Sequence, residues 1–160
     1  MNDFTEVNGN IVTLAEEGHF DVVVHGCNCF CVMGAGLAPQ MARAFGADKF
    51  ALEQPRFKGV INKLGMIDYE YRDVPGRKLA VVNAYTQYGF GRNHANGTES
   101  PVDYEAIQMA FRKMNHIFKG KTIGVPQIGC GLAGGSWSIV RKLIHAELAD
   151  MKVVIVNYVQ

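Results

Sequence analysis

The sequence has no excess of charge of either sign and no long apolar run. Its 160 residues include 16 Lys and Arg against 15 Asp and Glu, for a net charge of +1. This balance argues against a dedicated nucleic-acid or membrane-surface binder, because both classes need a basic excess or a basic stripe. No apolar run approaches the roughly 18 residues of a membrane span, and residues 1–6 lack the charged-then-apolar layout of a signal peptide. We therefore expect a cytoplasmic protein without membrane association.

Cysteine is also scarce, and the four residues are unevenly placed. Cys27, Cys29 and Cys31 alternate along the chain, and Cys130 lies far from them. Their spacing matches neither a disulfide framework nor a paired-cysteine zinc site. A metal site made of His25, Cys27 and Cys29 is one interpretation, but we favour reduced thiols on and just after a strand. No carboxylates have ligand spacing either, so the sequence predicts neither a metal nor a cofactor.

The chain is the size of one domain, and residues 1–160 are expected to form it. A mass of 17.6 kDa divided between two domains would leave each half short of core. No repeat, low-complexity tract or linker interrupts the sequence. Hydrophobic residues make up 48% and charged residues 19%, which is typical of a globular protein. No apolar stripe is left over beyond the expected core faces, so we expect a monomer.

Strands alternate with helices along the chain, which predicts a three-layer α/β/α domain with a mixed, mostly parallel sheet. β-branched or alternating runs predict strands over residues 4–7, 21–25, 67–71, 79–85, 122–128 and 153–158. Helices are predicted over residues 37–45, from Ser100 to Phe118 and over 137–148. Ser100 is the candidate N-cap of the long helix, and Pro101 suits its first position. Residues 8–10 are expected to form a turn and residues 86–100 a loop.

Two glycine-rich stretches each lie between an expected strand and an expected helix. Gly34–Gly36 follows the strand that ends at His25, and Gly129–Gly134 follows the strand that ends at Ile128. Glycine lets backbone N–H groups approach an anion, and a helix N-terminus adds unpaired donors. Two such loops at one edge of a sheet would form a cleft for a diphosphate, whereas tight turns are the alternative. The G-x-G-x-x-G of the second loop does not predict an NAD-dependent dehydrogenase, because only one strand follows it.

Three segments, over residues 25–29, 33–38 and 125–137, resemble the motifs of macro domains in the same order along nearly the whole chain. The first motif, His-Gly-Cys-Asn-Cys, is most similar to that of the ADP-ribose-1''-phosphate phosphatases of yeast and phage type. This resemblance implies a macro domain with an ADP-ribose cleft. It also implies the following ligand contacts: Asn10, Ile11, Asn28, Met33, Gly34, Ala35, Gly36, Leu37, Ala38, Pro126, Ile128, Gly129, Cys130, Gly131, Leu132, Ala133, Gly134 and Tyr158. Asn10 and Ile11 would lie at the adenine end and Asn28 at the distal ribose.

The chain departs from macro domain patterns at several positions. The adenine-contacting residue is usually Asp but here is Asn10, whose amide oxygen can still accept a hydrogen bond. Ala35 replaces the middle glycine of the first loop, so its methyl fits only an ordinary backbone conformation. Ala38 and Ala133 stand where hydrolases of protein-linked ADP-ribose often have Asp. The segment Tyr85-Thr86-Gln87-Tyr88 lacks the lysine used by the class that acts on glutamate.

The resemblance leaves three functions open. The first is hydrolysis of ADP-ribose-1''-phosphate, with His25 as general acid/base titrating near pH 6.5 and Asn28 as the residue that orients the distal ribose. The second is removal of ADP-ribose or an acyl group from another molecule at the same cleft. The third is a reader that binds ADP-ribose without chemistry, in which His25 only holds the loop. Gln87 and His94 are the other side chains expected near the distal ribose.

Overall fold

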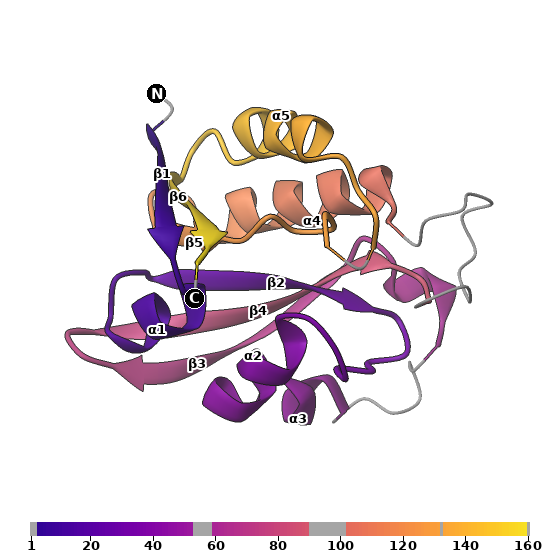
Figure 1. The fold of residues 1–160 in the computed structure, drawn as a ribbon, viewed down its shortest axis with the longest axis horizontal. Coiled ribbons are helices and arrows are strands. Elements are labelled where there is room, and N and C mark those ends of the chain that lie inside the picture. Colours follow the sequence, from indigo (N-terminus) through magenta and orange to yellow (C-terminus); the bar gives the residue numbers. More distant parts are fainter. Residues whose placement is uncertain (1–2, 53–58, 90–101, 132, 160) are drawn as a thin grey trace.

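The computed structural model describes residues 3–52, 59–89, 102–131 and 133–159. Its centre is a six-stranded sheet in the order β1-β6-β5-β2-β4-β3 (Figure 1). The strands are β1 (Asp3–Gly9), β2 (Val22–Asn28), β3 (Ile67–Val74), β4 (Arg77–Gln87), β5 (Thr122–Val125) and β6 (Lys152–Tyr158). All neighbours pair in parallel except β3 and β4, which are antiparallel. The mixed, mostly parallel sheet expected from the sequence is confirmed.

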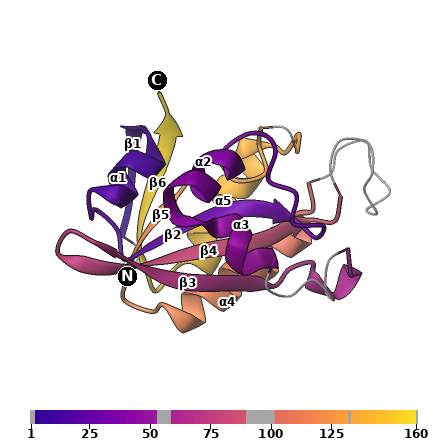
Figure 2. The ribbon, with the colours of Figure 1, turned by 90° about the horizontal axis from the view of Figure 1, so that it is seen from below.

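Helices cover both faces of the sheet (Figures 1 and 2). On one face lie α1 (Ile11–Glu16), α2 (Ala38–Phe45) and α3 (Ala47–Leu52), and on the other lie α4 (Tyr104–Ile117) and α5 (Trp137–Glu147). A short 3-10 turn, η2 (Ile61–Lys63), precedes β3. Alternate residues of β2 enter different cores, since Val22 and Val24 pack in the cluster that includes α4 and α5, whereas Val23 packs in the cluster that includes α1 to α3. The three-layer architecture follows from this alternation.

Two helices of the first layer were not expected from the sequence. Asn10, interpreted as part of a turn, is instead the N-cap of α1, and its Oδ1 accepts hydrogen bonds from the N–H groups of Val12 and Thr13 at 3.0 and 3.2 Å. Gly46 ends α2 in the left-handed conformation, with φ 66°, and α3 starts at the next residue.

Several expected boundaries were also wrong. β2 continues past His25 to Asn28, and β4 continues to Gln87, so that Thr86 and Gln87 belong to the strand rather than to a loop. β5 ends at Val125 rather than Ile128, since Pro126 has no N–H with which to continue the ladder.

The long helix starts later than expected. Asp103, in an extended conformation with φ −127°, is the N-cap of α4, and its side chain accepts from the N–H of Ala106 at 3.0 Å. The expected N-cap, Ser100, and the expected first residue, Pro101, lie outside the described residues.

β5 and β2 are parallel neighbours at the middle of the sheet, and the chain leaves them toward opposite edges. From β2 the chain passes through α2 and α3 toward β3 at one edge, and from β5 it passes through α5 to β6 on the other side. In open α/β sheets, ligands bind outside the carboxyl ends of the strands at such a point. Of the helices that the structure describes, none has the length and apolarity needed to span a membrane.

Candidate functional site

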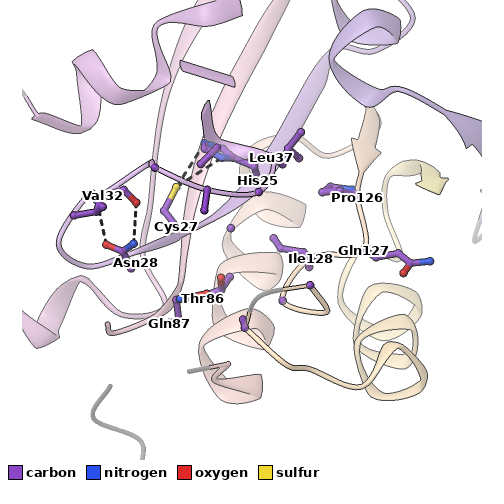
Figure 3. Close-up of a pocket in the computed structure, with 18 residues that line it drawn as sticks. His25, Cys27, Asn28, Val32, Leu37, Thr86, Gln87, Pro126, Gln127 and Ile128 are labelled. Carbon is purple, nitrogen blue, oxygen red and sulfur yellow. Dashed lines mark hydrogen bonds between the residues drawn. The ribbon is translucent and has the colours of Figure 1, made fainter. Parts of the chain in front are cut away.

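A cleft of about 570 Å³ lies at the carboxyl ends of β2, β4 and β5 (Figure 3). This volume is within the ~300–1,000 Å³ of small-molecule sites. The cleft is lined by both glycine-rich stretches and by the ends of the strands: His25, Gly26, Cys27, Asn28, Val32, Gly34, Ala35, Gly36, Leu37, Ala38, Thr86, Gln87, Pro126, Gln127, Ile128, Gly129, Gly131 and Ala133. The structure therefore brings together most of the ligand contacts that the resemblance implied.

The first glycine stretch presents unpaired backbone donors to the cleft. Gly34, Ala35 and Gly36 are exposed, and their N–H groups have no hydrogen-bond partner among the described residues. The stretch leads into α2, whose N-cap residue Leu37 makes no side-chain capping bond. Cys31 is the one described non-glycine residue with a positive φ, so the methyl of Ala35 sits on an ordinary backbone, as required. Free N–H groups ahead of a helix N-terminus favour an anion here.

The second glycine stretch is folded back on itself. The N–H of Gly135 donates to the carbonyl of Gly129 at 2.7 Å, and that of Gly134 donates to the carbonyl of Gly131 at 3.0 Å. Gly129 and Gly134 have φ values of 75° and 76°, which favour glycine. Gly131 is exposed at the wall of the cleft, and an added Cβ would meet no atom within 4 Å. α5 starts at Trp137, as the sequence predicted, with two residues between it and the end of this stretch.

Asn28 lines the cleft but uses its amide to hold the chain that follows it. Its Oδ1 accepts from the N–H groups of Phe30 and Val32 at 3.1 and 3.2 Å, and its Nδ2 donates to the carbonyl of Val32 at 2.9 Å (Figure 3). The side chain is 7% exposed. One amide hydrogen is left for a ligand, so that contact with the distal ribose stays a prediction.

His25 lines the cleft with its side chain almost fully buried. It is 1% exposed, and its Nε2 lies 2.5 Å from Oδ1 of Asn83. Burial lowers the pKa of His25 to about 4, against the opposing effect of the hydrogen bond to Asn83. The imidazole is therefore neutral at pH 7, and the titration expected near pH 6.5 is corrected.

A buried polar network continues behind His25, away from the cleft. Asn83 donates from Nδ2 to Asp68 at 2.9 Å, and the hydroxyl of Tyr85 donates to the other oxygen of Asp68 at 2.6 Å. The ammonium group of Lys63 lies 3.6 Å from Asp68 and 4.4 Å from the centre of the Tyr85 ring. This network fixes the end of β2 against β3 and β4 and gives the His25 ring one orientation.

The cysteines near His25 are free and buried. Cys27 Sγ lies 3.5 Å from Nε2 of His25, and burial raises the pKa of the Cys27 thiol. Burial likewise raises the pKa of Cys29 to about 11. Neutral thiols are poor metal ligands. Within the described ranges, no group of three His, Cys, Asp or Glu side chains is arranged to hold a metal ion.

Charge is absent from the described lining of the cleft. The residues there include no Asp, Glu, Lys or Arg. Phosphates bound in it would meet backbone N–H groups and neutral side chains, with no carboxylate to repel them.

Some implied contacts do not line the cleft. Ile11 is buried in the core under α1, Met33 packs against two core clusters, and Tyr158 is 61% exposed at the end of β6. The Oδ1 of Asn10 already accepts two hydrogen bonds in α1, which leaves it less free to accept from an adenine. Cys130 and Gly134 belong to the second stretch without lining the cleft, while Leu132 and His94 lie outside the described residues.

The sequence-based analysis missed five of the lining residues: Gly26, Cys27, Val32, Thr86 and Gln127. Gln87, expected near the distal ribose, does line the cleft. Thr86 is the most informative omission, because it is 1% exposed and its Oγ1 has no hydrogen-bond partner among the described residues. The sequence contained one signal for Thr86, since it is a polar residue that follows a largely apolar run of strand residues.

No family model matches the chain. An uncharacterized 17.5 kDa protein of Enterobacteria phage T4, from the tk-vs intergenic region, is 31% identical over 160 residues, which are 95% of this chain and 94% of that protein. Among solved structures, the macrodomain of Thermus aquaticus DarG is similar with a TM-score of 0.73 and 21% identity, covering 100% of both chains. Thermosipho africanus DarTG in complex with ADP-ribose gives a TM-score of 0.75 and 18% identity over 100% of this chain and 42% of that chain. The chain therefore belongs to the family of the phage T4 protein, and its fold is the macro domain fold.

Proposed function

We propose that this protein binds ADP-ribose in the cleft and hydrolyses ADP-ribose-1''-phosphate to ADP-ribose and phosphate. The observation that carries the proposal is the pair of glycine-rich stretches on a cleft whose described lining is uncharged. The first stretch offers the free N–H groups of Gly34, Ala35 and Gly36 to a diphosphate. Solved relatives of the same fold include one in complex with ADP-ribose, which supports this ligand class.

The lining chemistry favours a phosphate ester over a protein-linked ADP-ribose as the substrate. Ala38 and Ala133 both line the cleft, so neither position supplies a carboxylate. A phosphate dianion at the distal end is repelled by carboxylates, and an uncharged lining with N–H donors accommodates it. Water replaces the ester oxygen at phosphorus, and the released alcohol is the 1''-hydroxyl of ADP-ribose.

In this mechanism His25 starts as a base. Because Nε2 donates to Asn83 and the ring is neutral at pH 7, the unprotonated nitrogen is Nδ1. Nδ1 would take a proton from the attacking water once the cleft admits water to it, and that proton would pass to the departing 1'' oxygen, so that the alcohol is released neutral. The backbone N–H groups of the first stretch would stabilise the charge on the phosphoryl oxygens, and Asn28 would hold the ribose.

A non-catalytic ADP-ribose reader is the second candidate. It is favoured by the 1% exposure of His25 and by the hydrogen bonds that already occupy the amide of Asn28. Such a reader needs the glycine-rich stretches but no proton-transferring side chain.

One assay separates these functions. The protein is incubated with ADP-ribose-1''-phosphate and, separately, with ADP-ribosylated protein, and free phosphate and free ADP-ribose are measured. The proposal predicts phosphate release from the first substrate alone. Release of ADP-ribose from the second would indicate a hydrolase of protein-linked ADP-ribose, and no release from either, with ADP-ribose still bound, would indicate a reader.

A further inference from the structure

Thr86 holds a buried hydroxyl group without a partner at the floor of the cleft. Of the buried side-chain nitrogen and oxygen atoms that the structure describes, Oγ1 of Thr86 is the one that makes no hydrogen bond. A buried polar group left unpaired destabilises the folded protein, and buried polar groups are almost always paired. The residue lines the cleft beside Gln87 at the end of β4 (Figure 3).

A slip in strand register places Thr86 in this position. Cys27 of β2 pairs with Tyr85 of β4, whereas the next residue, Asn28, pairs with Gln87, so that Thr86 has no partner on β2. Irregularities of this kind re-aim a side chain and occur next to binding sites. The carbonyl group of Thr86 accepts from the N–H of Asp103 at 3.1 Å, which anchors the slipped residue to the start of α4.

The neighbouring strand leaves room for the hydroxyl. Gly26 of β2 lies beside it, and a Cβ added to Gly26 would stand 2.7 Å from Oγ1 of Thr86 and 3.1 Å from Cγ1 of Ile128. The 2.7 Å separation is shorter than the contacts that Cβ atoms make in real proteins, so a side chain at residue 26 would displace the hydroxyl. Gly26 is thus required for the position that Thr86 occupies.

The other polar side chains around this point are already engaged. Gln87 donates from Nε2 to the carbonyl of Gly89 at 2.8 Å, Asn28 holds residues 30 and 32, and His25 is bonded to Asn83. The hydroxyl of Thr86 differs from these groups because it makes no hydrogen bond at all, so a ligand can engage it without competing with an existing partner.

We propose that Thr86 is a positioning residue, whose hydroxyl donates a hydrogen bond to an oxygen at the distal-ribose end of the ligand. The proposal rests on the binding of ADP-ribose proposed above. It assigns the end of β4 to the distal ribose, and the ligand would supply the hydrogen-bond partner that the protein itself does not give to Oγ1 of Thr86. The O–H of Thr86 can donate a hydrogen bond to a ribose hydroxyl oxygen or to a phosphate oxygen.

The test uses Thr86→Val, which keeps the branched shape and removes the hydroxyl, and Thr86→Ser, which keeps the hydroxyl. The matched control is Thr5→Val at an exposed position of β1. Calorimetry with ADP-ribose and with ADP, which lacks the distal ribose, measures affinity, and chemical denaturation of the unliganded variants measures stability.

We expect Thr86→Val to weaken ADP-ribose binding about tenfold, the value of one hydrogen bond, with ADP affinity unchanged within about twofold. Thr86→Ser should restore ADP-ribose affinity to within about threefold, and Thr5→Val should change neither ligand's affinity. Unliganded Thr86→Val should be at least as stable as the wild type, because an unpaired buried hydroxyl is removed.

Two results would overturn the assignment while leaving the proposed function intact. The first is undiminished ADP-ribose affinity in Thr86→Val. The second is an equal loss for ADP and ADP-ribose together with lower stability, which is what a purely structural role predicts. A wild-type protein that binds neither ligand would remove the proposed function and this inference together.

Discussion

The ring of His25 and the amide of Asn83 form a hydrogen bond between adjacent strands, with Nε2 and Oδ1 separated by 2.5 Å. The amide is oriented by its other contacts, since Nδ2 donates to the carbonyl of Ala47 at 3.1 Å and to Asp68 at 2.9 Å. Oδ1 must therefore accept, and Nε2 carries the ring hydrogen. A charged imidazolium here would be buried with one neutral partner, which is the physical reason for its lowered pKa.

The free energy of unfolding should decrease as the pH falls from 7 toward 4.5. The pKa of His25 is about 4 in the folded protein, below its unperturbed value of 6.5, so the unfolded chain binds the proton first. This contribution is complete above pH 6.5 and is lost as the pH falls toward 4, by about 2–3 kcal/mol at pH 4.5. Urea denaturation between pH 7.5 and 4.5 measures it. In His25→Gln the free energy of unfolding should depend less on pH over this range. An unchanged pH dependence in this variant would contradict the lowered pKa of His25.

His25→Ala should separate binding from chemistry. If Nδ1 acts as the base, phosphate release should fall by roughly 100-fold or more, the usual size of a general-base contribution, while ADP-ribose affinity stays within a few-fold. The wild-type rate should show no His25 ionisation between pH 5.5 and 8, because its pKa is about 4. Phosphate release measured across this range, beside calorimetry, tests both points. Near-normal turnover in His25→Ala would make the residue structural.

Gly26→Ala should destabilise the protein by about 1–3 kcal/mol, because its methyl would overlap Oγ1 of Thr86 and crowd Ile128. The loss of stability caused by Gly26→Ala should be smaller in a Thr86→Ala background, because Oγ1 of Thr86 is absent there. A double-mutant cycle by chemical denaturation measures this coupling, expected at about 0.5–3 kcal/mol. Strictly additive effects would mean that the two residues do not share this space.

Asp103→Ala should cost about 1 kcal/mol of stability through the loss of the α4 N-cap. Asp103→Ser keeps an oxygen that can accept from Ala106 and should cost less. Ser100→Ala provides the comparison, and it should change stability by no more than about 0.5 kcal/mol, because Asp103 rather than Ser100 caps α4. Thermal denaturation followed by circular dichroism measures all three variants. The reverse order of effects would place the start of the helix at Ser100.

Periodicity and turn chemistry predicted the layers and the six strands, because the buried strands are short, apolar and bounded by glycine or polar residues. α1 was missed because its capping residue, Asn10, also fits a turn after Asn8 and Gly9, and because six residues are too few to show a helical stripe. α3 was missed for a related reason, since Gly46 ends one helix and does not show that another starts at once.

The two loops of the site were predicted, but the state of its side chains was not. Glycine content and a position between strand and helix are local features of the sequence, and they predicted the two stretches that line the cleft. The low pKa of His25 depends on burial beneath residues distant in sequence, and the position of Thr86 beside the cleft depends on a register slip against β2. Neither property can be inferred from the residues that are adjacent in sequence.

Gly131→Val should abolish ADP-ribose binding without unfolding the protein. The φ of Gly131 is not positive, and its missing Cβ points into open space, so that the backbone tolerates a side chain. A branched side chain would occupy the cleft where the ligand is expected. Gly131→Ala, which adds one methyl group, should weaken binding less. The thermal midpoints of both variants without ligand should match that of the wild type.

Calorimetric titration with ADP-ribose, with AMP as the comparison ligand, is the most direct measurement of the central claim that this cleft binds ADP-ribose. The wild type should bind ADP-ribose at one site and bind AMP more weakly, because AMP lacks the distal ribose and one phosphate. Gly131→Val, shown to be folded by its thermal midpoint, should bind neither at the wild-type level. Equal affinity for AMP and ADP-ribose, or undiminished ADP-ribose binding in Gly131→Val, would contradict the claim.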